Sequence, residues 1–143
     1  MGSPSSPRAP DPPLYSRGRY VTAAAIAMLA LMGVLMFASA WNDTVTFDEE
    51  PHIGAGYAYL RKADARLNPE HPPLMKDLAA FPLLFLHLRA PWDDKRWIEG
   101  QFEEWTFGQE LLFNSGADPD LVMRAARAPI ILFTVAFGWL IFW

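Results

Sequence analysis

Residues Tyr20 to Trp41 read YVTAAAIAMLALMGVLMFASAW and contain no charged side chain. A helix needs about 20 apolar residues to cross the hydrocarbon core of a bilayer, because it rises about 1.5 Å per residue. The stretch is long enough for such a span, and an aromatic residue stands at each end, as is common at membrane–water interfaces. We therefore predict a transmembrane helix over residues 20–41.

The charges on either side of this span indicate its orientation. Arginines precede it and acidic residues follow it directly, and positively charged flanks tend to stay in the cytoplasm. Residues 1–19, which are rich in proline and serine, are predicted to be a disordered cytoplasmic tail. Residues 42–127 are predicted to form a long loop on the extracytoplasmic side.

A cleaved signal peptide is the alternative interpretation of the same stretch. The small residues Ala38, Ser39 and Ala40 fit a cleavage site, and a basic region precedes the apolar run. Against it, the apolar run is longer than a usual signal core, and the leader before it is long and rich in proline. We therefore favour a retained membrane anchor.

A second apolar run begins at Ala128 and continues to Trp143. It is short for a complete span and has no polar flank after it. We expect residues 128–143 to be a truncated second transmembrane helix. The predicted fold class is therefore an all-α membrane protein, an N-terminal fragment of a polytopic protein with one complete and one partial transmembrane helix joined by a long outer loop.

The composition excludes several classes of function. The chain has 143 residues, of which 52% are hydrophobic, and it has no cysteine, so neither a disulfide framework nor a thiolate metal site is possible. The formal net charge is −4, and no basic block is present, so nucleic acid is not an expected partner. The apolar residues are gathered in runs, which favours membrane lipid as a partner.

The loop over residues 42–127 divides into shorter pieces. Hydrophobic spacing and proline positions predict interfacial helices, separated by a proline-fixed turn. Asp48 or Thr46 is a candidate N-cap for the first helix, and Asp118 with Pro119 predicts the start of the last one. The predicted pieces are a helix over 51–64, a turn over 65–73, an interface-lying or re-entrant helix over 73–88 and a surface helix over 93–116.

The run Asp48-Glu49-Glu50 is the first candidate site. Carboxylates at a helix N-terminus are stabilised by the free amides, by about 0.3–1 kcal/mol each, and this can be their whole role. The functional interpretation places Asp48 about one turn beyond the membrane, where an ionised carboxylate can accept a proton from an incoming hydroxyl or amine. The two interpretations are compatible.

Glu70 and His71 form the second candidate, because the prolines around them hold the backbone rigid. They can be solvated side chains of a turn, or part of an anion or metal site. With Glu49 and His52 they supply enough nitrogen and oxygen ligands for a divalent ion, although their spacing along the chain is not that of a known metal motif. We expect no cofactor and leave a divalent metal open.

Three basic residues, Lys76, Arg124 and Arg127, lie beside apolar segments on the outer side. They can extend along apolar surface to reach lipid headgroups. Alternatively, they can pair with a lipid-linked phosphate.

Two motifs in this order resemble the first outer loop of membrane-embedded C-type (GT-C) glycosyltransferases. They are FDE..H...GY.YL, which starts at Phe47, and R.NPEHPPL.K.LAA.PLL, which starts at Arg66. The closest likeness is to bacterial relatives of protein O-mannosyltransferases, including those with a domain named after rhizobial lipopolysaccharide glycosyltransferases. The stretch Trp105 to Phe133 is similar to the segment that leads into their second membrane helix, so the resemblance covers about residues 20 to 143.

The resemblance implies a bacterial inner-membrane enzyme that uses a polyprenyl-phosphate sugar and inverts the anomeric centre. Asp48 matches the family's loop acid, thought to be the base or to bind the acceptor, and Glu49 matches its acidic neighbour. His71 and Lys76 match the family's HPPL element and basic position. The expected catalytic residues are Asp48 and Glu49, and the expected substrate-binding residues are His52, Glu70, His71, Lys76, Arg124 and Arg127.

The function expected from this comparison is transfer of a sugar from the lipid-phosphate donor to an acceptor protein, lipid or glycan outside the cytoplasm. Since that family has about ten or more membrane helices, this chain by itself is expected to be inactive. A non-enzymatic bitopic membrane protein, whose outer loop binds a partner, is the alternative. A third alternative is a secreted metal-binding domain that remains after cleavage of a signal peptide.

Overall fold

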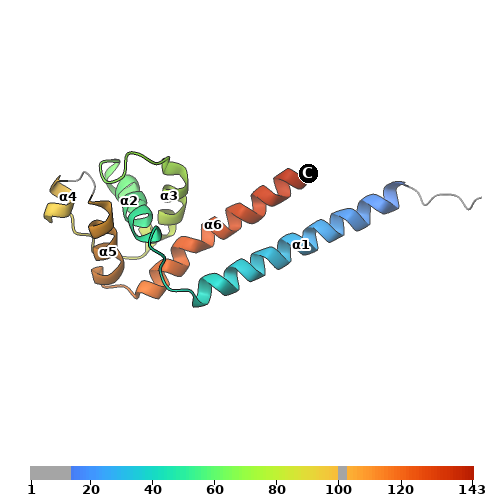
Figure 1. The fold of residues 1–143 in the computed structure, drawn as a ribbon, viewed down its shortest axis with the longest axis horizontal. Helices are drawn as coiled ribbons and strands as arrows, with labels where there is room; N and C mark the ends of the chain where they lie inside the picture. The colour runs from blue at the N-terminus through green and yellow to red at the C-terminus, as the bar shows by residue number, and fades with distance from the viewer. Residues whose placement is uncertain (1–13, 100–102) are drawn as a thin grey trace, which may run out of the picture.

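The computed structural model describes residues 14–99 and 103–143, so most of the predicted tail lies outside the described residues. Within them the chain is all-helical and contains no strand, which confirms the predicted all-α class. The two longest helices lie side by side, and the shorter ones form a compact head, residues 43–118, at one end of this pair (Figure 1). The helices are α1 (Leu14–Asn42), α2 (Glu49–Lys62), α3 (Pro73–Ala80), the 3₁₀ helix η1 (Phe81–Phe85), α4 (Lys95–Glu99), α5 (Glu104–Asn114) and α6 (Pro119–Phe142).

Both long helices, α1 and α6, are apolar and long enough to cross a membrane. Their contact uses glycine on each side. A Cβ atom on Gly138 would stand 2.7 Å from Leu29 Cδ2, and one on Gly33 would stand 3.3 Å from Val135 Cγ2. Small residues therefore let the two helices approach closely, as is common between membrane helices. These features indicate membrane association.

The structure differs from the predicted boundary at residue 128, because α6 is one continuous helix of 24 residues from Pro119. Its start agrees with the sequence: Pro119 is in the first turn, and the Asp118 side chain accepts a hydrogen bond from the Asp120 amide at 3.0 Å. Pro129 lies inside the helix without ending it. The first turns of α6 belong to the head, since Val122 and Ala126 are buried there.

Helix α2 begins two residues before the predicted start at Pro51. Asp48 occupies the N-cap position, which is one of the two predicted alternatives, but its side chain makes no capping hydrogen bond. The Thr46 amide instead donates to Glu49 Oε2 at 2.8 Å, and the Glu49 amide donates to the Thr46 carbonyl at 3.1 Å. This reciprocal pair fixes the entry to α2, and within residues 14–99 and 103–143 the Asp48 carboxylate forms no hydrogen bond.

The other predicted helices of the loop are interrupted. The piece predicted over 73–88 is α3 followed by η1, because Pro82 cannot donate the backbone hydrogen bond that an α-helix needs. The piece predicted over 93–116 forms α4 and α5, and residues 100–102 between them lie outside the described residues. Helix α5 ends at Asn114, as the following glycine predicts.

The head has its own core, formed by side chains from five elements. Tyr57 of α2 and Phe107 of α5 lie at its centre, together with Leu67 and Leu83, and all four are at most 1% exposed. The Trp92 ring stacks parallel to that of Tyr57 with centroids 6.1 Å apart. The loop between the long helices is therefore a packed unit, which can hold polar side chains in fixed positions.

Two glycines allow α2 to pack closely against its neighbouring helices. A Cβ on Gly108 of α5 would stand 2.1 Å from the Glu50 carbonyl oxygen, and one on Gly56 of α2 would stand 2.2 Å from the Lys76 carbonyl oxygen. These distances are shorter than any real contact, so both glycines are required by the packing. Through them α2 brings its first turn close to α5 and α3.

We expect Gly108→Ala to destabilise the head by about 1–3 kcal/mol, because the added methyl group meets backbone that cannot move aside. Gly18→Ala in α1 is the matched control, since a Cβ there has nothing within 4 Å. Thermal denaturation of both variants in detergent micelles, followed by circular dichroism, measures the difference. Equal loss of stability in the two variants would contradict this account of the α2–α5 crossing.

Candidate functional site

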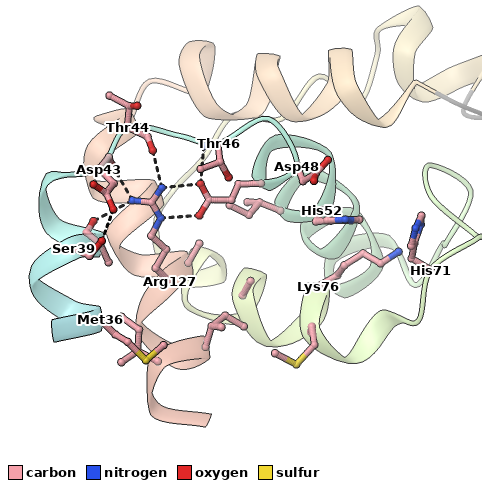
Figure 2. Close-up of a pocket in the computed structure, with 18 of the residues that line it drawn as sticks. Met36, Ser39, Asp43, Thr44, Thr46, Asp48, His52, His71, Lys76 and Arg127 are labelled. Carbon is pink, nitrogen blue, oxygen red and sulfur yellow. Dashed lines mark hydrogen bonds and ion pairs between the residues drawn. The ribbon is translucent and has the colours of Figure 1, made fainter. Parts of the chain in front are cut away.

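A cavity of about 1050 Å³ opens between the two long helices and the head. Its walls come from the end of α1, the linker to α2, the first turn of α2, α3 and the middle of α6 (Figure 2). One wall is apolar and comes mainly from the membrane helices, with Leu35, Met36, Ile130 and Ile131. A second wall is polar and carries Asp48, Glu49, His52, His71, Lys76 and Arg127.

Arg127 of α6 lies at the junction of α1, the linker and α2. An arginine side chain has five N–H groups, and all five donate here. Two form a bidentate pair with the Glu49 carboxylate, both at 2.7 Å. The other three donate to the carbonyl oxygens of Ala40, Asp43 and Thr44, at 3.0, 2.9 and 2.8 Å (Figure 2).

This network determines how Asp48 is presented. The Arg127 side chain is 12% exposed, and its contacts tie the end of α1 and the linker to the start of α2. Burial raises the pKa of Glu49, but the hydrogen bonds from Arg127 and Thr46 outweigh burial and hold the pKa below its ordinary value of 4.5. Glu49 is therefore ionised and fully engaged, whereas its neighbour Asp48 is exposed and lines the cavity.

Lys76 of α3 is a buried cation, with 4% of its surface exposed. Its ammonium group donates to Asn68 twice, to Oδ1 at 2.7 Å and to the backbone oxygen at 2.9 Å, and to the Tyr59 hydroxyl at 3.1 Å. It forms no ion pair within residues 14–99 and 103–143. Burial lowers the pKa of Lys76, while the nearby Asp77 and Glu104 carboxylates oppose that effect.

The two histidines meet at the cavity. The rings of His52 and His71 are in edge-to-face contact, with centroids 5.4 Å apart. His71 Nδ1 lies 3.2 Å from Asn68 Oδ1, whereas the buried His52 Nδ1 has no hydrogen-bond partner in the described part of the chain. The pKa of His52 is lowered by burial first and then by the Lys76 charge and His71.

Two of the predicted site residues lie away from this cavity. Glu70 is exposed on the turn before His71 and is not among the residues that line it. Arg124 lies over the Trp41 ring, 4.3 Å from its centroid, and has only long contacts of 3.4 Å to the Trp41 carbonyl and 3.5 Å to Asp120. It joins the ends of the long helices.

Sequence reasoning missed Asn68 and Tyr59, which hold Lys76. Asn68 is 6% exposed, and its backbone oxygen also accepts a hydrogen bond from the Tyr59 hydroxyl. Both residues stand inside the two quoted motifs, but neither is an obvious ligand or base. The sequence feature that could have indicated them is Lys76, because a lysine placed among apolar residues implies polar partners nearby.

No group of three or more Asp, Glu or His side chains in residues 14–99 and 103–143 is arranged to hold a metal ion. The described ionisable groups on the polar wall of the cavity are instead the Arg127–Glu49 ion pair, the buried Lys76, the Asp48 carboxylate and the histidine pair. Comparisons with models of protein families, with curated proteins and with solved structures find no match for this chain.

Proposed function

We propose that this chain works as part of a membrane glycosyltransferase, which moves a sugar from a polyprenyl-phosphate donor to a protein, lipid or glycan acceptor outside the cytoplasm. The observation that carries the proposal is the division of one cavity into an apolar and a polar wall. A polyprenyl-phosphate sugar has the same division. Its prenyl chain fits against Leu35, Met36 and Ile130, and its phosphate and sugar fit the polar wall.

The polar wall supplies the two charges that the reaction needs. The acceptor atom forms a bond to the anomeric carbon, while the bond from that carbon to the phosphate oxygen breaks and the phosphate leaves with the electron pair. Asp48 takes the proton from the acceptor, and the Lys76 cation stabilises the negative charge that grows on the phosphate. Since a phosphate ester is a good leaving group, no general acid is required.

Arg127 and Glu49 have a positioning role in this proposal. All five Arg127 N–H groups are used within the chain, so none remains for a phosphate. Glu49 is likewise engaged at both oxygens. We therefore assign the proton transfer to Asp48. The three N–H groups of Lys76 are also used within the chain, on Asn68 and Tyr59, so we assign to Lys76 stabilisation of the phosphate by its positive charge.

Binding of the donor's lipid phosphate tests the proposal directly. We expect polyprenyl phosphate to bind the chain in detergent micelles, and Lys76→Met to weaken binding about tenfold or more, since the positive charge is lost. Quenching of intrinsic tryptophan fluorescence on titration measures the affinity. Methionine preserves the apolar stem, and folding is checked by circular dichroism.

Lys95→Met is the matched control, because Lys95 has 77% of its side chain exposed and lies in α4, outside the cavity. Polyprenol, which lacks the phosphate, is the control ligand and is expected to bind more weakly than polyprenyl phosphate. If the two lipids bind equally well, or if Lys76→Met and Lys95→Met behave alike, phosphate recognition is excluded. A partner-binding membrane protein without enzymatic activity is then the better interpretation.

A further inference from the structure

The orientation of the Asn68 amide follows from its neighbours. The Lys76 ammonium group can only donate hydrogen bonds, so the Asn68 atom 2.7 Å from it must be the carbonyl oxygen Oδ1. The amide nitrogen Nδ2 then faces Glu104 Oε1 at 3.4 Å, where it donates to a carboxylate. Both ends of the amide are therefore matched to the correct kind of partner.

This orientation determines where His71 carries its proton. The same Asn68 Oδ1 lies 3.2 Å from His71 Nδ1, and a carbonyl oxygen can only accept. Nδ1 must therefore donate. Because a neutral imidazole carries a single proton, the other nitrogen, Nε2, is left with a free lone pair.

The free nitrogen is available to a ligand. Nε2 lies on the edge of the ring that faces away from the nitrogen bound by Asn68. His71 is exposed and lines the cavity, and within residues 14–99 and 103–143 its ring forms no hydrogen bond other than the one to Asn68 (Figure 2). The Asn68 backbone is held as well, since its oxygen accepts hydrogen bonds from Lys76 and Tyr59.

We propose that Asn68 is a positioning residue that holds His71 as its Nδ1–H tautomer, so that Nε2 accepts a hydrogen bond from a hydroxyl group of the donor's sugar. This role rests on the proposed function of the cavity. A nitrogen lone pair repels phosphate oxygens and attracts a hydroxyl proton, so His71 is suited to the sugar, whereas Lys76 is suited to the phosphate. Asn68 contacts both groups and sets the spacing between them.

The tautomer can be measured without any ligand. In protein labelled with ¹⁵N-histidine and held in micelles at about pH 8.5, where imidazole is neutral, two-bond ¹H–¹⁵N spectra distinguish the two tautomers. We expect His71, identified by the signals lost in His71→Gln, to carry its proton on Nδ1. Asn68→Leu is expected to shift it to the Nε2–H form that free histidine prefers in water.

Two further variants distinguish a positioning role of Asn68 from a general loss of local structure. Asn68→Asp keeps an acceptor oxygen and is expected to retain the Nδ1–H form. Tyr59→Phe removes a contact to the Asn68 backbone and to Lys76 but leaves the Asn68 side chain in place, so it is also expected to retain that form. A proton on Nε2 in the unchanged protein, or a tautomer that Asn68→Leu leaves unaltered, would overturn the role of Asn68.

The hydroxyl contact has its own measurement. We expect polyprenyl-phosphate mannose to bind about three- to tenfold more tightly than polyprenyl phosphate, and this gain to vanish in Asn68→Leu and persist in Asn68→Asp. A gain that persists in Asn68→Leu, or no gain in the unchanged protein, would refute the sugar contact. Failure of both lipids to bind would refute the proposed function while leaving the tautomer result intact.

Discussion

Replacement of Arg127 by alanine is expected to lower the free energy of unfolding by about 3–5 kcal/mol, the range for removing one partner of a buried ion pair. The variant loses five hydrogen bonds at once. It also leaves the Glu49 carboxylate, only 26% exposed, without its cation. Thermal and denaturant unfolding in detergent micelles, followed by circular dichroism, measures the loss.

Arg124→Ala is the matched control. It removes the same side chain one turn earlier on α6, where the contacts are longer and the partner Asp120 is 71% exposed. Exposed pairs of this kind contribute at most about 1 kcal/mol. We expect Arg127→Lys to be nearly as harmful as Arg127→Ala, because an ammonium group cannot form the bidentate pair and reach three carbonyls. Equal losses for Arg124→Ala and Arg127→Ala would contradict this role of Arg127.

The same ion pair predicts how stability depends on pH. Because the pKa of Glu49 in the folded protein lies below 4.5, its contribution is fully present above about pH 4.5 and is lost as the pH falls through the lowered value. In Arg127→Ala the burial that raises the pKa is no longer opposed by the arginine, so the contribution of Glu49 to the acid-induced loss of stability is expected to shrink or disappear. Unfolding midpoints measured at a series of pH values for both proteins test this difference.

The sequence predicted those parts of the fold that depend on local pattern. The apolar run over residues 20–41 lies within α1, and the Asp118–Pro119 signal marks the start of α6. The boundary predicted between the outer loop and the second membrane helix at residue 128 does not interrupt α6, because the first turns of α6 are stabilised by packing against the head, which no local pattern reports. Whether a stretch continues as one helix depends here on tertiary contacts.

The candidate site was predictable in its residue types but not in its pairings. The sequence identified Glu49 and Arg127 separately, yet their bidentate contact joins residues 78 positions apart in the chain. It proposed that Arg127 could pair with a phosphate, whereas the fold gives each of its N–H groups a partner within the chain. Asn68 received no role because an asparagine before a proline is typical of turns, and its function depends on Lys76 and His71 reaching it.

Asp48→Asn is expected to reduce sugar transfer by about 10²–10⁴-fold, the usual contribution of a positioned general base. The substitution preserves the shape of the side chain, and since Asp48 makes no capping bond, folding should be unchanged. The measurement is transfer of radiolabelled mannose from polyprenyl-phosphate mannose to membrane acceptors, with the variant expressed as the complete product of its gene. Circular dichroism and membrane fractionation confirm folding and insertion.

Asp93→Asn is the control for loss of an exposed carboxylate of the head, and it should transfer sugar at the normal rate because Asp93 lies outside the cavity lining. Asp48→Asn should still bind polyprenyl phosphate normally, since stabilisation of the phosphate is assigned to Lys76.

A loss of transfer with intact binding separates proton transfer from donor recognition. Normal transfer by Asp48→Asn would remove Asp48 from the chemistry. Glu49 is engaged at both oxygens by Arg127 and could not replace it. The base would then be a histidine of this wall, His52 or His71, or a group outside the cavity.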